Sequence, residues 1–165
     1  MEQIEIEYLP KVNDYLEAYS LYEANTTQRK VEKVMCFLFA AVGLIIILFS
    51  LNNIRNIIIG LFVMSIGLLD FFGIIDFAKI IIKLQSKKST KFKYVHKIKF
   101  IDEGMEFETN GVKSFIKWEF YKKYYEGKNI FVLVYDNRQY SVFPKEAFND
   151  KIDTFKRVLS EKIKQ

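Results

Sequence analysis

The sequence has one cysteine and one histidine, and this scarcity excludes several kinds of chemistry. Cys36 alone forms no internal disulfide, and with His96 as the only histidine the chain has too few ligands for a Cys/His zinc site. The sequence also has no glycine-rich phosphate loop and no serine or cysteine in a nucleophile motif. We therefore expect a protein that is not an enzyme and that carries no metal and no cofactor.

Proline and glycine are also scarce, and charge is unevenly distributed. Two prolines and seven glycines leave little sequence for linkers. Residues 1–33 carry four basic and seven acidic side chains, whereas residues 85–165 carry eighteen and eleven, so the basic balance belongs to the C-terminal half. No motif typical of RNA or DNA recognition accompanies these lysines, and we expect no nucleic-acid partner.

The middle third of the sequence has almost no charge. The run VMCFLFAAVGLIIILFSL (34–51) has no charged residue, and IIIGLFVMSIGLLDFFGII (57–75) has only Asp70. A helix needs roughly 20 apolar residues to cross a bilayer, and the short NNIRN sequence between the runs makes the two helices antiparallel. A soluble domain of this size has no shell that could enclose both. We predict a hairpin segment at 34–84, with transmembrane helices at 34–51 and 57–78.

Basic residues flank this hairpin on one side, which indicates its orientation. They precede the first run and follow the second, whereas the connecting loop has only Arg55. The positive-inside rule then places both termini in the cytoplasm of a multi-pass protein of the cell membrane. Four lysines after the second helix are expected to contact the anionic headgroups of the lipid bilayer, namely Lys87, Lys88, Lys91 and Lys93.

Small residues predict how the two helices pack. They form a stripe on each helix at helical spacing, with Cys36, Ala40 and Gly43 on the first and Gly60 and Gly67 on the second. Asp70 lies close to the second stripe and is expected to face the first helix beside Cys36. Its carboxylate has two interpretations, a contact between helices or a proton or ion role. The hairpin could also associate into an oligomer.

After Ser89 the pattern changes to short alternating strands. Strands are predicted at 91–101, 104–109, 112–118, 121–126, 130–135 and 138–143, and an amphipathic helix follows them to Ile163. Asn110-Gly111 is a strong β-hairpin signal. The sequence QIEIEY (3–8) alternates as well and supplies a seventh strand, followed by a mostly polar helix over 11–31. We predict an α+β membrane protein whose hairpin is inserted into a seven-stranded β-barrel or sandwich.

The first strand accounts for part of the lysine-rich stretch KFKYVHKIKF (91–100). If strand 3–8 pairs with it, Glu5 and Glu7 face Lys93 and its neighbours, at roughly 0.2–1 kcal/mol per pair. Alternatively, the two glutamates bind a basic strand of another protein. The predicted segments are therefore an N-terminal strand and helix at 1–33, the hairpin at 34–84, and a β domain at 85–165 that strand 3–8 completes.

One aromatic and basic stretch of the β domain is a candidate interface. It contains Trp118, Tyr121, Lys122, Lys123 and Tyr124. The alternative interpretation is structural: the tryptophan packs in the core, and the lysines protect a solvated edge strand.

The order of these parts resembles the YcxB-like family of Gram-positive bacteria. The resemblance covers the layout of the chain and the motifs GMEFET and IKWEFYKKYYEGKNIFVLVYDNRQYSVFPKEAF. Its matching residues are Gly104, Trp118, Tyr121, Pro144, Lys145 and Phe148. The resemblance implies a small bacterial membrane protein with a pleckstrin-homology-like (PH-like) cytoplasmic domain. The family has no established reaction and supplies no catalytic residues.

These observations predict a non-enzymatic protein that is anchored in the membrane and presents a PH-like domain to a protein partner in the cytoplasm. Two alternatives remain open. The protein could be an immunity protein that protects its producer against a secreted toxin or bacteriocin. It could also be an accessory subunit of a transporter or channel that uses Asp70.

Overall fold

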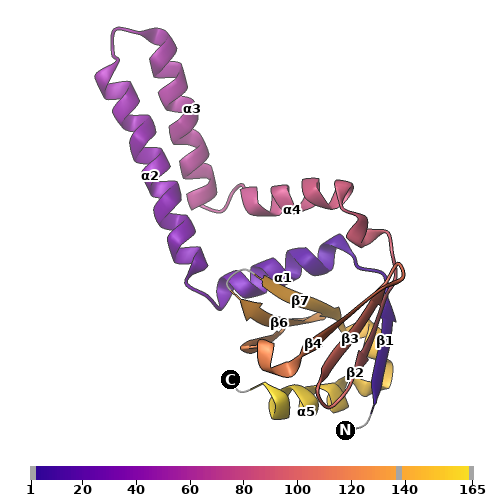
Figure 1. Ribbon diagram of the computed structural model, residues 1–165. Coiled ribbons are helices and arrows are strands. Elements are labelled where there is room, and N and C mark those ends of the chain that lie inside the picture. The colour runs from indigo at the N-terminus through magenta and orange to yellow at the C-terminus, as the bar shows by residue number, and fades with distance from the viewer. Residues whose placement is uncertain (1–2, 137–138, 164–165) are drawn as a thin grey trace. The chain divides into compact units, whose positions relative to one another are not determined.

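The computed structural model describes residues 3–136 and 139–163, and Figure 1 labels its elements. The chain divides into two compact units. One combines Met1–Tyr22 with Ile82–Gln165, and the other is Glu23–Ile81. The first unit is therefore built from two segments that the whole second unit separates in sequence. These boundaries lie at 22/23 and 81/82, somewhat before the predicted boundaries at 33/34 and 84/85.

The second unit contains two long antiparallel helices, α2 (Gln28–Phe49) and α3 (Ile54–Phe71), which lie side by side in Figure 1. The side chain of Asn53 caps α3, because its Oδ1 accepts a hydrogen bond from the Arg55 N–H at 3.1 Å. Both helices are long and apolar enough to cross a membrane. This confirms the predicted pair of apolar helices joined by a short loop.

The second helix ends earlier than predicted. The sequence predicted a helix over 57–78, but α3 ends at Phe71 and Gly73 adopts a φ of 69°. A left-handed glycine is a common helix stop, since it has no Cβ to clash. A separate helix, α4 (Phe77–Lys88), then begins, with Asp76 Oδ1 accepting a hydrogen bond from the Lys79 N–H at 2.9 Å. The apolar residues around Gly73 hide this break from a hydropathy pattern.

The first unit holds seven strands within the described residues, in two antiparallel sheets. The four-stranded sheet has the order β1 (Ile4–Tyr8), β2 (His96–Phe100), β3 (Gly104–Thr109) and β4 (Val112–Lys117). The three-stranded sheet has the order β5 (Lys123–Glu126), β6 (Ile130–Asp136) and β7 (Gln139–Pro144). Residue 138, the predicted start of the last strand, lies outside the described residues.

The first strand pairs with β2, as predicted, although the helices α1 to α4 separate the two strands in the sequence. Ile6 is opposite Ile98, and Tyr8 is opposite His96. The predicted hairpin turn is also present, because Asn110 and Gly111 both have positive φ, at 47° and 76°. Paired positive φ values suit a tight two-residue turn that matches the twist of its strands.

The strands do not close into a barrel within the described residues, so the barrel part of the prediction is wrong. β4 and β5 belong to different sheets because a 3-10 turn, η2 (Trp118–Phe120), separates them. The two sheets are linked instead through a side chain, since the Tyr8 hydroxyl donates to the Val142 carbonyl at 2.9 Å. The result is an open sandwich whose main core receives side chains from the C-terminal helix.

The central strand β6 is buried on both faces and joins two layers of packing. Ile130, Val132 and Val134 pack with Ala18 and Tyr22 of α1 (Val12–Ala24). The other face of β6 belongs to the main core, which also includes residues of the four-stranded sheet. The two sides of this strand thus explain its continuous apolar sequence.

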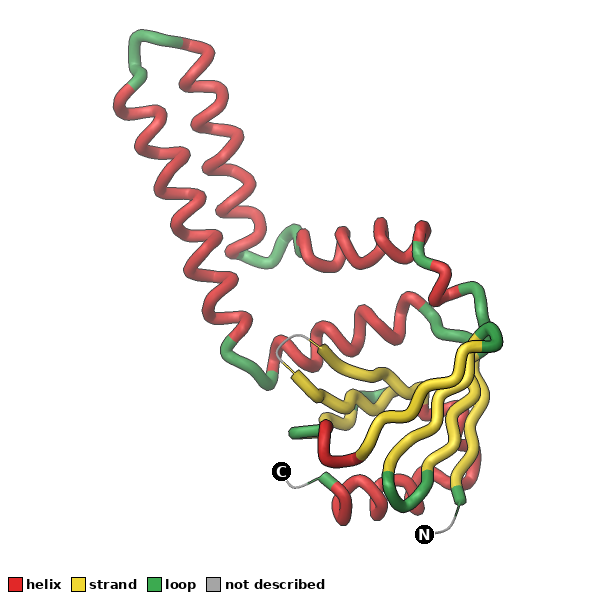
Figure 2. The backbone as a smooth tube through the Cα atoms, in the orientation of Figure 1, coloured by secondary structure: helices red, strands yellow, loops and turns green. Residues whose placement is uncertain are grey.

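The main core is closed by α5 (Ile152–Lys162). The Phe155 ring of this helix lies 4.7 Å from the Phe100 ring and 5.2 Å from the Phe131 ring, between centroids. Phe155 therefore contacts one strand of each sheet. Figure 2 shows α5 and α1 on opposite sides of the strands. Within the described residues of the first unit, no helix lies over the outward face of the four-stranded sheet in Figure 2. Charged residues such as Glu7, Lys97 and Glu108 are opposite one another across its strands.

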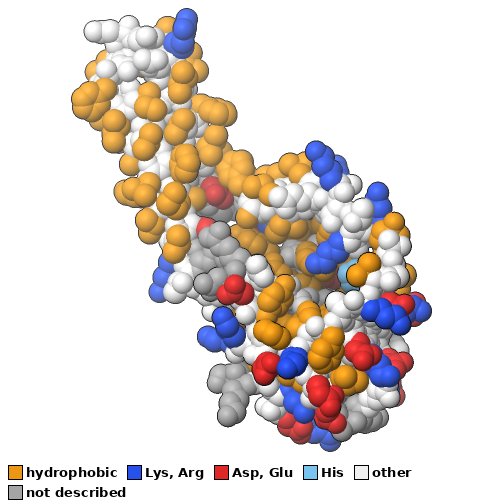
Figure 3. All heavy atoms as spheres, in the orientation of Figure 1, with side chains coloured by type: hydrophobic (Ala, Val, Ile, Leu, Met, Phe, Trp, Pro, Cys, Tyr) orange, Lys and Arg blue, Asp and Glu red, His pale blue; other side chains and the backbone are white. Residues whose placement is uncertain are grey.

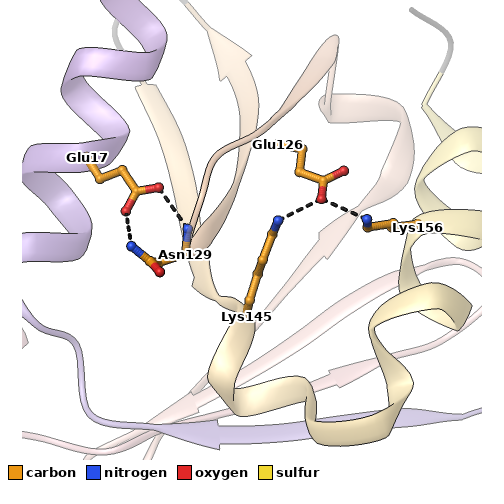
Figure 4. A network of polar contacts seen from close by, with 5 residues as sticks. All are labelled: Glu17, Glu126, Asn129, Lys145 and Lys156. Carbon is orange, nitrogen blue, oxygen red and sulfur yellow. Dashed lines mark hydrogen bonds and ion pairs between the residues drawn. The ribbon is translucent and has the colours of Figure 1, made fainter.

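A polar network fixes the β5–β6 turn (Figure 4). Glu126 accepts hydrogen bonds from Lys145 Nζ at 2.6 Å and pairs with Lys156 Nζ at 2.8 Å. Glu17 of α1 accepts from the backbone N–H of Asn129 at 2.9 Å and from its side-chain amide at 3.0 Å. The turn is thereby tied to α1 on one side and to the C-terminal helices on the other.

We expect Glu126 to make the stability of this unit pH-dependent. Hydrogen bonds from Lys145 and Lys156 lower the pKa of Glu126 below its ordinary value of 4.5. Because the folded pKa is the lower one, the stabilisation is complete above about pH 4.5 and is lost as the pH falls through the folded pKa. Glu126→Gln should therefore lower the free energy of unfolding at neutral pH, and lower it less in acid, where Glu126 is protonated. The loss at neutral pH should be at most about 1 kcal/mol, because the pairs are partly exposed.

Urea unfolding of the full chain in detergent micelles, followed by the fluorescence of the buried Trp118, measures this effect. Glu161→Gln is the matched control, because it removes an exposed glutamate of α5. The control should stay close to the wild type throughout. An equal difference between Glu126→Gln and wild type in acid and at neutral pH would show that the network does not act through the charge of Glu126.

Candidate functional site

The two apolar helices touch along the stripe of small residues. A Cβ atom added to Gly67 would lie 2.7 Å from the Ala40 nitrogen and from the Cys36 carbonyl oxygen. A Cβ atom added to Gly43 would lie 2.6 Å from the Gly60 carbonyl oxygen. These distances are too short for a real Cβ, so only glycine allows the backbones to meet here. The structure thus brings all five of the predicted small packing residues into one contact.

Asp70 reaches the facing helix at the end of this contact. The Cys36 thiol lies 3.2 Å from Asp70 Oδ2, where it can donate a weak hydrogen bond to the carboxylate. Close by, Lys33 Nζ lies 5.9 Å from the centroid of the Phe71 ring. This arrangement agrees with a structural contact between the helices. A proton or ion role for Asp70 stays a prediction.

A basic segment follows the helix pair. Residues 77–101 contain eight lysines and no acidic residue. Of the four predicted headgroup lysines, Lys87 and Lys88 end α4, whereas Lys91 lies in the 3-10 turn η1 (Thr90–Phe92) and Lys93 follows it. Lys91 Nζ lies 4.2 Å from the centroid of the Tyr15 ring, in a cation–π contact that holds η1 against α1.

The predicted pairing of Glu5 and Glu7 with Lys93 needs a correction. Glu7 Oε2 lies 3.3 Å from Lys97 Nζ, and Glu5 Oε1 lies 3.6 Å from Lys99 Nζ. Lys93 is outside the sheet because β2 begins only at His96, after η1, whose start is capped by the Ser89 hydroxyl accepting from the Lys91 N–H. Ser89 is a typical helix-capping residue, and in the sequence it was the one indication that a helical turn precedes the strand. Both pairs are exposed and contribute at most about 1 kcal/mol each.

The candidate interface of five residues does not form one surface. Trp118 and Tyr121 are each only 4% exposed. The Trp118 Nε1–H donates to the Ile101 carbonyl at 2.9 Å, and the Tyr121 hydroxyl shares a hydrogen bond with Ser141 Oγ at 3.0 Å. Both therefore belong to the core, whereas Lys122 and Lys123 are exposed and Tyr124 is half-buried. The structure therefore agrees with the alternative interpretation, in which Trp118 packs in the core.

The sequence pattern missed a groove on the outward face of the four-stranded sheet. Its open volume is about 730 Å³, and residues of β1, β2, β3 and β4 line it. Two cross-strand rows give it alternating charge, Glu5–Lys99–Glu106–Phe115 and Glu7–Lys97–Glu108–Lys113. The alternation of Glu106 and Glu108 in GMEFET was a usable signal, but it needed the strand register. Such a surface can complement an extended charged segment.

His96 and the carboxylates of this unit are the groups that could hold a metal ion or transfer a proton. Within residues 3–136 and 139–163, no three His, Cys, Asp or Glu side chains are close enough to hold a metal ion. His96 is half-buried, with its ring 5.6 Å from that of Tyr8. Burial, and the nearby charge of Lys91, lower the pKa of His96. A neutral imidazole packed on a tyrosine is part of the fold.

We expect a side chain at position 67 to separate α2 from α3. Gly67→Ile forces a Cβ and a branched chain into backbone atoms, which costs about 1–3 kcal/mol of packing energy. The reaction rate of Cys36, the only thiol, with a small maleimide in detergent micelles reports this separation. The rate should rise about fivefold or more, because α3 no longer packs against the thiol and the contact between Cys36 and Asp70 is lost.

Ser65→Ile is the matched control, because Ser65 is exposed on the same helix. It adds the same side chain without touching α2, so the rate at Cys36 should stay at the wild-type value. Equal rates in Gly67→Ile and wild type would mean that the helices do not meet at this glycine.

Comparison with known proteins agrees with the resemblance in the sequence. Residues 100–159 match the model of a family described as YcxB-like protein. No curated protein and no solved structure matches the chain. The matched segment runs from the last residue of β2 to Leu159 of α5, and so includes β3, β4 and the whole three-stranded sheet but not β1. The protein therefore carries a YcxB-like segment at residues 100–159, as its sequence predicts.

Proposed function

We propose that this protein is a non-enzymatic interaction protein anchored in the cell membrane. In this proposal the α2–α3 hairpin crosses the bilayer, both termini lie in the cytoplasm, and the β domain binds a protein partner at the membrane surface. The observation that carries the proposal is the apolar surface that the hairpin leaves uncovered.

That surface is large. Only 11% of the apolar window of each helix is buried inside the protein. Phe37 is 63% exposed, Phe62 is 66% exposed, and Phe49 is 87% exposed. Figure 3 shows hydrophobic side chains over most of the visible face of the hairpin. In water each half-exposed side chain would forfeit about 1 kcal/mol of burial energy, whereas lipid removes this cost.

The charges at the ends of the helices support the orientation. At the end of the hairpin where α2 meets α3, Arg55 in the first turn of α3 is the only charged residue, whereas eight lysines follow within residues 77–101. Lysine and arginine near helix ends stay on the cytoplasmic side of a membrane. The first and second segments of the β domain would therefore meet on the same side, as their pairing through β1 and β2 requires.

A PH-like identity for the β domain rests on its layout. A four-stranded and a three-stranded antiparallel sheet enclose one core, and a final helix closes it. The YcxB-like match lies within this unit. We propose an open PH-like sandwich that lacks barrel closure.

We assign the partner to the groove on the outward face of the four-stranded sheet. It combines two rows of alternating charge with Phe115, which is 47% exposed on the edge strand β4. Val112 and Phe120 near the same edge are 64% and 59% exposed. Exposed apolar side chains beside paired charges are typical of a protein contact.

Single-cysteine labelling tests the membrane arrangement. In a Cys36→Ser background, Asn52→Cys places a thiol in the α2–α3 loop and Lys128→Cys places one in the β5–β6 turn, both at exposed positions. A membrane-impermeant maleimide added to intact bacterial cells should label the loop position about tenfold more than the turn position. The turn position should react fully only after permeabilisation. Labelling of Lys128→Cys in intact cells would contradict the orientation.

Site-specific photo-crosslinking tests the partner surface. A photoreactive phenylalanine analogue at Phe115 should yield a discrete crosslinked product with another protein, because the ring lies on the groove. The same analogue at Glu161, exposed on α5, is the control and should yield at least about threefold less. Products that contain only this chain, or the same products at both positions, would rule out a partner at the groove.

A further inference from the structure

Helix α4 has an apolar stripe that the protein does not cover. Phe77, Ile80, Ile81 and Leu84 follow the spacing i, i+3, i+4 and i+7, which places them on one face of the helix. Ile80 is 42% exposed, Ile81 is 51% exposed and Leu84 is 57% exposed. No residue of α4 is buried.

The rest of α4 is basic. Lys79 and Lys83 lie away from the stripe, and Lys87 and Lys88 end the helix. Asp76, just before the helix, pairs with Lys79 at 3.1 Å, and no acidic residue follows it until Asp102. A short helix with an apolar face and lysines beside it matches the surface of a bilayer that contains anionic lipids.

The chain keeps α4 close to the end of α3. Only the five residues 72–76 separate the two helices. Fully extended, they span at most about 20 Å, so the start of α4 stays near the point where α3 ends. If α3 crosses the bilayer, that point is the membrane surface.

We propose that α4 lies in the plane of the cytoplasmic membrane surface and binds anionic phospholipid. Ile80, Ile81 and Leu84 insert among the upper parts of the acyl chains, and the lysines contact the headgroups. This rests on the proposed insertion of the hairpin. It adds a second lipid contact that is separate from the crossing helices and directly precedes η1 and β2 of the β domain.

Fluorescence quenching in vesicles tests this contact. The full chain, with Cys36→Ser and one environment-sensitive probe on a new cysteine, is reconstituted into phosphatidylcholine vesicles with about 30 mol% phosphatidylglycerol. Shallow spin-labelled lipids should quench a probe at Leu84→Cys about twofold or more above a probe at Ser86→Cys, which is on the opposite side of α4. Vesicles of phosphatidylcholine alone should reduce the quenching at Leu84→Cys.

A third probe, at Phe62→Cys in α3, separates this proposal from the proposed function. Quenching at position 62 with equal quenching at 84 and 86 would leave the hairpin in the bilayer and overturn the placement of α4. No quenching at position 62 would overturn both proposals. A blue-shifted probe at position 84 without lipid quenching would mean that a second copy covers the stripe, and it too would overturn the proposal. Equal quenching at 84 in both vesicle types would contradict the preference for anionic lipid.

Discussion

The structure depends on the apolar surface that α2 and α3 leave exposed after they have packed together. Two helices in contact can hide one stripe each, and here glycines at the contact make that stripe narrow. The remaining circumference carries large side chains such as Phe49 and Phe62. In water this surface would favour aggregation, whereas in a bilayer it is the ordinary exterior of a helix pair. If lipid surrounds the helix pair, its basic flanks set the orientation and α4 starts at the membrane surface.

The β domain tolerates the inserted helices because its first strand is anchored from several directions. β1 pairs with β2 in full register, and the Tyr8 hydroxyl bonds across to the second sheet. Ile4 and Ile6 are almost completely buried. The insertion therefore leaves the sheet intact. The chain leaves the first unit after Tyr22 and returns to the same unit at Ile82. Under the proposed arrangement, α4 and η1 form the return path from lipid to sheet.

Elements with a regular local sequence pattern could be predicted. Features that depend on one backbone position or on the register of several strands could not. The apolar runs, the alternation in QIEIEY and the Asn110-Gly111 turn each predicted its element, because one local pattern determined it. The small-residue stripes likewise brought Asp70 to Cys36. The sequence did not reveal the break at Gly73, since apolar residues surround it, or the late start of β2, which shifted the partner of Glu5 from Lys93 to Lys99. The groove required the register of four strands, which no single segment contains.

Alkaline carbonate washing of membranes from cells that express the full chain tests the membrane claim most directly. This wash strips proteins held at the surface by charge and leaves helices that cross the bilayer in the pellet. Insertion of α2 and α3 predicts that the chain stays in the pellet until detergent is added. Recovery of the chain in the wash as a soluble, monodisperse monomer would contradict it.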